Sequence, residues 1–477
     1  MLAVGVVLAT ALRVLASGYL PYDDALRHVA KAVSGRPWSE ILLLGPGFDL
    51  DSNPGWHAIL GALHRFPGLG SVDLLLASVV LLFVLFSLGP ILLLRRPEAW
   101  LLSLALLNVV DPGTFVRLMS GRPFIVSSAI VPVVFLLWPR LETPRWRGPF
   151  ALFVACGAAA CWIHGSYYLL ALPVLALLVA GRWRAGARLA AAFAIGVALG
   201  ALLTGHPLGH LGQMLRHGWA SVGMPRSTEA LVSEFQPFEG KAAAVVAFFA
   251  LLAWRHARRP GAAPPWREPV VVMAAGSWAL GYVAARFWQD WSAPALLTLA
   301  ALEFQDALEA HEGRAARLSA GLVAAVLVFL GVGADSQQRW SSMPQRVFLS
   351  RDNPTHAPWL PEPGGVAYSA DMWVFYAMFF RNPDAPWRYV LGFEPAMMPP
   401  EDYRVYREVR RSGGATESYL PWLRRMRPSD RLYVMNHSPV PPPIPGLEWF
   451  QPVLTVWAGR LPRADEPGLA PPAGPDR

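Results

Sequence analysis

The sequence has few charged residues and almost no cysteine. Only 16% of its 477 residues are Asp, Glu, Lys or Arg, against roughly 25% in soluble domains, which excludes an ordinary soluble protein. The two cysteines, Cys156 and Cys161, are five residues apart in one apolar segment. They therefore point to different faces of a helix, and we expect neither a mutual disulfide nor a metal site. The sequence also lacks nucleic-acid-binding motifs and internal repeats.

Apolar residues dominate what is present. They make up 54% of the chain, and the mean hydropathy is +0.34. This composition predicts an integral membrane protein. A spanning helix needs about 20 apolar residues, and windows of that size predict about eleven crossings: 1–20, 73–94, 98–112, 122–138, 149–163, 166–181, 187–204, 241–254, 269–285, 292–306 and 317–335.

The positions of the arginines predict the orientation of these spans in the membrane. They gather in alternate short loops, which the positive-inside rule places in the cytoplasm: Arg95 and Arg96; Arg140, Arg145 and Arg147; Arg182, Arg184 and Arg188; Arg255, Arg258, Arg259 and Arg267; Arg314 and Arg317. The N-terminus is then cytoplasmic, and the long loops 21–72 and 205–240 lie outside. A cleaved signal peptide is the alternative for the first span, because Val14-Leu15-Ala16 resembles a cleavage site, but no basic region precedes the apolar run.

The chain changes character after the last apolar span. Residues 336–461 are rich in proline and charge, with strand-like runs at 365–368, 388–392, 431–435 and 452–458 between helical stretches at 402–411 and 417–426. This pattern predicts a small soluble extracytoplasmic α/β domain that follows a membrane domain of residues 1–335. The Pro- and Gly-rich tail, 462–477, is expected to be disordered.

Ionisable residues of the predicted membrane domain are concentrated at the outward ends of the spans. Such residues are costly inside a bilayer, so their depth is informative. They are Arg13, Asp23, Asp24, Asp111, Arg117, Arg122, His164, Arg286 and Asp290. A secondary transporter would instead hold charges near the midplane of two related halves. We therefore expect any chemistry to lie at the outer interface.

Each of these residues also has a purely structural interpretation. Asp23 and Asp24 are suited to cap the amphipathic stretch 25–33. Arg117 and Arg122 are suited to anchor the interface, and His164 stands beside a helix break. Arg286 and Asp290 have the spacing of a helical ion pair. The functional interpretation depends on their occurring together on one side of the membrane.

Taken together, these features resemble the GT-C superfamily of polytopic glycosyltransferases, which use polyprenyl-phosphate-linked sugars. The resemblance rests on a first span followed at once by Asp23-Asp24-Ala25-Leu26-Arg27-His28 and on the Pro-containing stretch that runs from Asp51 to Leu60 and includes His57. Further along, it includes Arg122-Pro123, the Arg-aromatic stretch from Arg286 to Pro294 and an outer soluble domain. Within that domain, Trp373, the run Phe379 to Pro383 and the run Tyr389 to Pro395 are similar to those of uncharacterised bacterial members, although Glu394 replaces their usual Asp.

The resemblance implies a sugar transferase of the bacterial inner membrane that acts on its outer face. The expected partners are a polyprenyl-phosphate sugar donor, the lipid bilayer, and a glycan, lipid or protein acceptor. Asp23 would act as general base, while Asp24 would orient the acceptor or, with Asp23, hold a divalent cation such as Mg²⁺ or Mn²⁺. The substrate-binding candidates are Arg27, Arg117, Arg122 and Arg286 at the phosphate, Asp51 and His57 at the sugar, and their neighbours His28, His164 and Asp290.

Two other classes of function stay open. One is a non-catalytic scaffold or flippase-like component of cell-envelope polysaccharide assembly, in which the acids are helix caps. The other is a transporter. A distance of more than about 10 Å between Asp23 and every outward arginine would favour the scaffold, because an acceptor must touch both base and sugar.

Overall fold

The structure is a computed structural model. It describes residues 2–16, 20–21, 23–66, 69–223, 233–238, 240–261, 263–310, 313–333, 340–341, 348–453 and 455–462. The chain divides into two compact units, which are described separately below. Unit 1 comprises Met1–Val33, Leu50–Arg226 and Leu231–Ser342, and unit 2 comprises Ser34–Asp49, Ser227–Ala230 and Met343–Arg477. The predicted tail, 462–477, lies outside the described residues from 463 onward.

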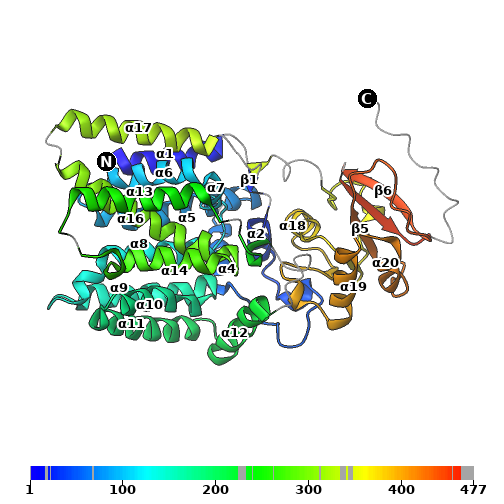
Figure 1. The fold of residues 1–477 in the computed structure, drawn as a ribbon. Coiled ribbons are helices and arrows are strands. Elements are labelled where there is room, and N and C mark those ends of the chain that lie inside the picture. Colours follow the sequence, from blue (N-terminus) through cyan, green and yellow to red (C-terminus); the bar gives the residue numbers. More distant parts are fainter. Residues whose placement is uncertain are drawn as a thin grey trace. The chain divides into compact units, whose positions relative to one another are not determined.

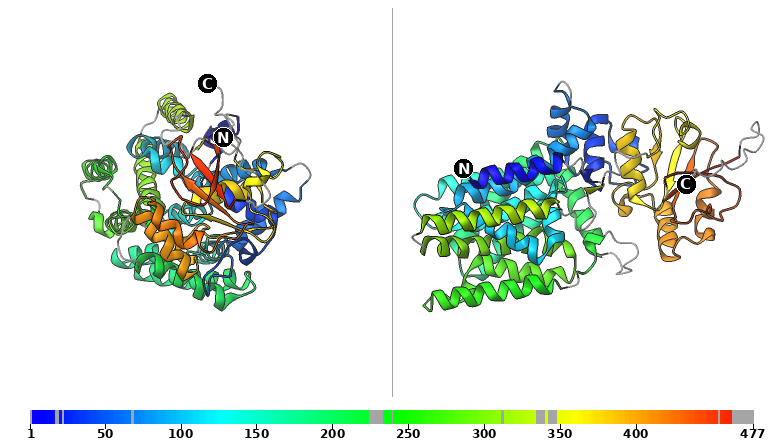
Figure 2. Two further views of the ribbon diagram at one scale, coloured as in Figure 1. Left: turned by 90° about the vertical axis from the view of Figure 1, so that its right-hand side faces the viewer. Right: turned by 90° about the horizontal axis from the view of Figure 1, so that it is seen from above.

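Unit 1 is helical. Its longer helices lie side by side in one bundle, and the short helices α2, α4 and α7 gather with α12 at one end of it (Figure 1, Figure 2). The helices are α1 (Leu2–Ala16), α2 (Ala25–Ser34), α4 (Pro54–His64), α5 (Ser71–Leu93), α6 (Glu98–Val110), α7 (Pro112–Arg117), α8 (Phe124–Leu141), α9 (Arg147–Ala159), α10 (Ala171–Val179), α11 (Trp183–Leu202), α12 (Pro207–Gly223), α13 (Ala242–Arg258), α14 (Pro269–Gly281), α15 (Ala285–Phe287), α16 (Ala293–Ala310) and α17 (Arg314–Gly333).

Several shorter elements complete unit 1. Two π-helical turns, Ala160–His164 and Trp288–Ser292, continue α9 and precede α16, and 3₁₀ turns occur at Tyr167–Leu170, Ser233–Phe235 and Pro265–Arg267. The strands β1 (Leu20–Pro21) and β2 (Trp340–Ser341) form a two-stranded antiparallel sheet. The helix break expected at His164 is present, because Gly165 takes a left-handed conformation (φ +77°) that ends the helix.

The predicted number of about eleven crossings is not confirmed. Within the described residues, three helices are long and apolar enough to cross a membrane: Ser71–Leu93, Phe124–Leu141 and Trp183–Leu202. Four further apolar stretches are shorter: Glu98–Val110, Tyr167–Val179, Pro269–Gly281 and Leu318–Gly331. The reason is that apolar sequence and continuous helix do not coincide: the window 98–112, for example, contains a helix of 13 residues, which at 1.5 Å per residue is about 20 Å long.

Glycines allow the closest packing between helices α9 and α11. A Cβ atom at Gly196 would lie 2.2 Å from the carbonyl oxygen of Val154 and 2.9 Å from the Cα atom of Gly157. Both contacts are with backbone, which cannot move aside as a flexible side chain can. Small residues of this kind let membrane helices approach each other closely.

We therefore expect Gly196→Ala to destabilise unit 1 by about 1–3 kcal/mol, the usual cost of overpacking. Gly276→Ala in α14 is the matched control, because a Cβ there meets no atom within 4 Å and both changes gain the same helix propensity. Thermal unfolding in detergent, followed by circular dichroism, measures the difference. Equal unfolding temperatures for the two variants would contradict the packing argument.

Unit 2 is an α/β domain with a five-stranded sheet of order β4-β3-β5-β7-β6. β3 pairs in parallel with β4 and β5, whereas β7 pairs antiparallel with β5 and β6. The strands are β3 (Val366–Ser369), β4 (Arg388–Tyr389), β5 (Arg431–Met435), β6 (Glu448–Val453) and β7 (Val456–Arg460). The helices are α3 (Trp38–Ile41), α18 (Met372–Arg381), α19 (Pro400–Arg411) and α20 (Thr416–Leu423), with 3₁₀ turns at Ala357–Trp359 and Pro395–Met397.

The sequence pattern predicts most, but not all, of the elements of unit 2. The predicted strand 452–458 is wrong, because the chain reverses there between β6 and β7, which are antiparallel neighbours. Helix α18 was not predicted, although its N-terminus carries a cap: the Asp371 side chain accepts a hydrogen bond from the Trp373 backbone N–H. Its apolar residues are nearly continuous and are buried, so they give no amphipathic pattern.

Candidate functional site: a network of acids and arginines in unit 1

The acid pair stands at the start of helix α2. The Asp23 side chain accepts a hydrogen bond from the Ala25 backbone N–H at 3.3 Å, which is the predicted cap. The two carboxylates are in different surroundings: the Asp23 side chain is 31% exposed and that of Asp24 is 11% exposed. Asp24 contacts Nε of Arg27 and lies 3.2 Å from its Nη2. Asp23 is therefore the carboxylate that a ligand can reach.

Arg122, in the turn before α8, connects this pair to a second group of charges. Its guanidinium lies 3.3 Å from Asp24 (Nε to Oδ2) and 4.0 Å from Asp23 (Nη1 to Oδ2). It also contacts Glu234 of the 3₁₀ turn Ser233–Phe235. Arg117, at the end of α7, lies 2.8 Å from the same Glu234 carboxylate. Glu234 thus bridges two arginines.

The second group ends at Arg286 of helix α15. Asp290 accepts from Arg117 Nε at 3.2 Å and from Arg286 Nε at 3.0 Å. Arg286 Nη2 also lies 2.8 Å from His164 Nε2, and the other ring nitrogen of His164 lies 2.8 Å from the Ser127 hydroxyl. The expected pair of Arg286 and Asp290 is present. This pair is part of a network in which acidic and basic side chains alternate, in the order Asp24, Arg122, Glu234, Arg117, Asp290 and Arg286.

A branch of histidines leaves the network at Asp24. His28 Nε2 lies 3.2 Å from Asp24 Oδ2, and His28 Nδ1 lies 2.9 Å from His57 Nε2 of helix α4. His57 Nδ1 lies 2.6 Å from Asp51 Oδ2. The buried face of α2 carries Arg27 and His28 toward these partners because its apolar residues Leu26 and Val29 pack into unit 1.

The opposite charges determine the ionisation of the network. Burial alone would raise the pKa of Asp24, but Arg27 and Arg122 outweigh it and hold that pKa well below its usual range. Arg117 and Arg122 similarly hold the pKa of Glu234 well below its usual range, against the effect of burial. In turn, Glu234 and Asp24 raise the pKa of Arg122 well above normal although burial opposes this. Asp24, Glu234 and Arg122 are therefore all charged at neutral pH.

His28, in contrast to the charged acids and arginines, is held in its neutral form, and this makes the stability of the fold depend on pH. Burial, aided by the charge of Arg27, lowers its pKa from 6.5 to about 3. Between pH 6.5 and about pH 3 the unfolded chain binds a proton at this histidine that the folded chain does not. The free energy of unfolding is therefore undiminished above pH 6.5 and falls as the pH is lowered toward 3.

We expect the unfolding temperature of the parent protein to fall by about 2–4 °C per pH unit below pH 6.5 on account of this histidine, since one proton corresponds to 1.36 kcal/mol per unit. In His28→Asn the slope should be shallower by this amount. Unfolding scans between about pH 7.5 and 4.5 measure both slopes. An unchanged slope in the variant would mean that His28 is protonated alike in the folded and unfolded states.

The structure brings all eleven predicted site residues into this connected set: Asp23, Asp24, Arg27, His28, Asp51, His57, Arg117, Arg122, His164, Arg286 and Asp290. Their roles stay predictions. Glu234 was missed, although it contacts both Arg117 and Arg122. It is an acid in the long segment 205–240 between two apolar stretches, and only its pairing with residues more than 110 positions away distinguishes it from a solvated charge.

The acid pair does not fit a divalent cation in this arrangement. A hard cation prefers several oxygen ligands, but the Asp24 carboxylate already faces Arg27, Arg122 and His28. Within the described residues no group of three or more His, Cys, Asp or Glu side chains has the arrangement of a metal site. We therefore derive no step through a metal.

Arg286 is one of the residues that line an apolar groove. Its volume is about 350 Å³, and Arg286 is the charged side chain among the residues that line it: Tyr168, Leu169, Leu215, Gly218, Trp219, Phe235, Ala284, Arg286 and Phe287. Phe235 is the neighbour in sequence of Glu234, and the Arg286 guanidinium lies 5.7 Å from the centre of its ring. The groove and the charge network thus meet at one guanidinium group.

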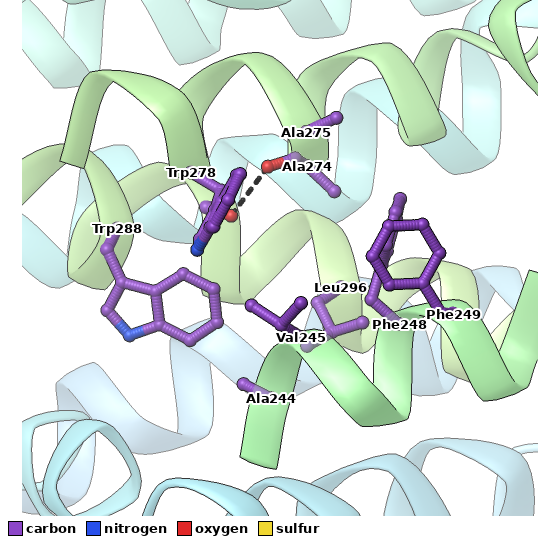
Figure 3. Close-up of a pocket in the computed structure, with 10 residues that line it drawn as sticks. Ala244, Val245, Phe248, Phe249, Ala274, Ala275, Trp278, Trp288 and Leu296 are labelled. Atoms are coloured by element: carbon purple, nitrogen blue, oxygen red, sulfur yellow. Dashed lines mark hydrogen bonds between the residues drawn. The ribbon is translucent and has the colours of Figure 1, made fainter. Parts of the chain in front are cut away.

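A second cavity of about 90 Å³ lies between α13, α14 and α16. In Figure 3, Trp288 stands at one side of it and Phe248 and Phe249 at the other. The Ser292 hydroxyl donates a hydrogen bond to the Ala274 carbonyl at 2.7 Å (Figure 3), which leaves the walls almost entirely apolar.

Comparison with known proteins finds similar solved structures. No protein-family model matches the sequence, and no curated protein matches it. Among solved structures, the chain is similar to the archaeal oligosaccharyltransferase AglB from Archaeoglobus fulgidus in complex with an inhibitory peptide and a dolichol-phosphate, with 13% sequence identity and a TM-score of 0.48. The match covers 91% of this chain and 69% of AglB. At 13% identity the likeness concerns the fold alone.

Proposed function

We propose that this protein is a membrane glycosyltransferase that moves a sugar from a polyprenyl-phosphate-linked donor to an acceptor. The observation that carries the proposal is the double role of Arg286, which lines the apolar groove and also belongs to the network that contains the acid pair. A lipid phosphate needs both features: apolar walls for its chain and a cation for its head. Such a donor would place its phosphate at the polar end of the groove.

The arginines are suited to stabilise the departing phosphate. A guanidinium presents donors in a fork that matches phosphate oxygens. Arg117 is only 2% exposed, and its Nη2 has no hydrogen-bond partner among the described residues. A buried donor without an acceptor is costly, and a phosphate oxygen would satisfy it. Arg286 and Arg117 share the Asp290 carboxylate, which fixes their mutual position.

The reaction needs one base. The bond between the anomeric carbon and the phosphate oxygen breaks, and its electron pair leaves with the lipid phosphate, which is already a stable anion. The acceptor oxygen forms the new bond to the anomeric carbon and loses its proton to a carboxylate. Asp23 is our candidate for this general base because it is more exposed than Asp24, whose oxygens are held by Arg27 and Arg122.

The geometry favours this function over a scaffold. In a scaffold the acids would serve as helix caps and the arginines as separate interface anchors. Asp23 is indeed a cap, yet its carboxylate lies 4.0 Å from Arg122, well within the 10 Å limit set above. A cap needs no buried arginines around it. The outer face of a bacterial inner membrane, with the N-terminus inside and unit 2 outside, stays part of the proposal.

Incubation of the purified protein in lipid nanodiscs with a panel of polyprenyl-phosphate hexoses tests the proposal. We expect at least one donor to be consumed, with release of polyprenyl phosphate detected by mass spectrometry. If the panel neither binds nor turns over, while the protein copurifies with other envelope-assembly proteins, the scaffold is the better explanation.

A further inference from the structure

The branch formed by Asp24, His28, His57 and Asp51 is a row of four titratable side chains joined by three short contacts. The distances are 3.2 Å from Asp24 to His28, 2.9 Å between the two rings, and 2.6 Å from His57 to Asp51. The His28 side chain is fully buried, whereas the Asp51 side chain, at the far end, is 22% exposed. The row therefore leads from the buried acid of the pair to a carboxylate that reaches solvent.

The row has fewer protons than contacts. Three hydrogen bonds need three protons, but two neutral imidazoles carry one N–H each and two ionised carboxylates carry none. Both carboxylates are ionised, because Arg27 and Arg122 face Asp24 while His57 and Lys31 face Asp51. Burial keeps both histidines neutral. One of the three contacts therefore lacks a hydrogen.

The contact without a hydrogen is best assigned to His28 and Asp24. The two shorter contacts, 2.6 and 2.9 Å, are those that hydrogen bonds shorten, and the longest contact, 3.2 Å, joins His28 Nε2 to Asp24. In this assignment the Nδ1–H of His57 donates to Asp51, and the Nδ1–H of His28 donates to Nε2 of His57. The lone pair of His28 Nε2 then faces the acid pair and is ready to accept a proton.

We propose that Asp24, His28, His57 and Asp51 form a proton relay that carries the acceptor's proton from the acid pair to Asp51. The proposal deepens the proposed function and rests on it. A proton that reaches Asp24 binds His28 Nε2, the Nδ1 proton of His28 moves to His57 Nε2, and the Nδ1 proton of His57 moves to Asp51. Each N–H bond that breaks is matched by one that forms at the next acceptor, and Asp51 then releases the proton to water.

The relay also explains how the base is restored. Asp23 and Asp24 are neighbours in sequence and face the same Arg122 guanidinium, at 4.0 and 3.3 Å, and in the proposed relay a proton passes from the first carboxylate to the second through water. The charged and titratable groups that face the two rings are Asp24, Arg27, Lys31, Asp51 and His164. After one transfer both rings carry their proton on Nε2, so these protons must exchange with water to restore the Nδ1–H forms before the next turnover. The cations Arg27 and Lys31 oppose a resting positive charge on the rings.

The first test is independent of catalysis. Protein labelled with ¹⁵N in its histidine rings, studied by NMR in nanodiscs, should show Nδ1–H on both His28 and His57. A scalar coupling should connect His28 Nδ1 to His57 Nε2 across their hydrogen bond. His28→Asn and His57→Gln assign the signals. A proton on Nε2 of His28 instead would place it in the contact with Asp24 and overturn the relay as drawn, whether or not the protein transfers sugars.

The second test uses turnover of whichever donor in the panel is consumed. Asp51→Asn keeps the shape of the row but removes its final proton acceptor, and we expect kcat to fall about tenfold, less than the roughly 10²–10⁴ of a group that takes the proton directly. KM should not change, and the solvent isotope effect on kcat should increase. His57→Gln should behave in the same way.

The matched control is His64→Gln, a histidine of helix α4 whose Nδ1 lies 3.3 Å from the Leu69 carbonyl outside the row. It should leave kcat and the isotope effect at parental values. If Asp51→Asn turned over at the parental rate with an unchanged isotope effect, the relay would be excluded while the transferase stood. If no donor were consumed by the parent, the proposed function would fail and the NMR result would still report the proton positions.

Discussion

Asp23→Asn is expected to abolish sugar transfer, with kcat reduced about 10²–10⁴-fold, the usual contribution of a general base. The amide has nearly the same shape as the carboxylate and still offers an oxygen to the Ala25 N–H, so the start of helix α2 should persist. It cannot accept the acceptor's proton at neutral pH. Turnover of a verified polyprenyl-phosphate sugar measures the loss, and binding of the same donor should be unchanged.

Asp73→Asn provides the control for that prediction. Asp73 also accepts a backbone hydrogen bond at a helix start, from Gly70 N–H at 3.0 Å, but it lies outside the charge network. Its amide variant should fold and turn over like the parent. A parental rate in Asp23→Asn would move the role of base to another carboxylate, for which Asp24 is the nearest candidate.

Arg286→Ala carries the second large effect. Among the described residues that line the apolar groove, Arg286 is the cation, so its removal should weaken the binding of a lipid phosphate while the binding of the lipid chain persists. A hydrogen bond to a charged group contributes about 1.5–3 kcal/mol, which corresponds to roughly a 10- to 150-fold increase in Kd. Farnesyl phosphate is a suitable probe, and farnesol, which lacks the phosphate, should bind the variant and the parent alike.

Two further variants separate charge from structure at this position. Arg286→Lys keeps the positive charge but loses the fork of donors, so its affinity for farnesyl phosphate should fall between those of Arg286→Ala and the parent. Arg216→Ala removes an exposed arginine of α12, the helix that also contributes Leu215 and Trp219 to the groove. It should bind farnesyl phosphate normally. Equal losses in Arg216→Ala and Arg286→Ala would indicate a diffuse electrostatic effect rather than a phosphate site.

The sequence predicted the components of the site better than the course of the helices. Asp23 and Asp24 are visible because two acids follow an apolar run directly, and the arginines are visible because charge is rare near apolar spans. Polarity at the ends of apolar segments is a local property, so a single sequence contains it. The helix break beside His164, at Gly165, could be predicted for the same reason.

What could not be predicted depends on contacts between distant residues. Glu234 matters because Arg117 and Arg122 converge on it from other elements, and nothing in its own neighbourhood indicates this. The row from Asp51 to Asp24 likewise requires α4 to lie against α2, so that two rings 29 residues apart meet. The predicted number of spanning helices is not confirmed because composition alone does not show where a helix ends: the window 98–112, for example, contains a helix of only 13 residues, Glu98–Val110.

We expect the acid pair and the groove lined by Arg286 to form one transferase site for a lipid-linked sugar. The decisive measurement is the release of polyprenyl phosphate from a panel of polyprenyl-phosphate hexoses by the parent protein and by Asp23→Asn, side by side in nanodiscs. The parent should release polyprenyl phosphate and the variant almost none, with equal donor binding. Donor that binds to the parent and is never consumed, or that both proteins consume equally, would exclude such a site.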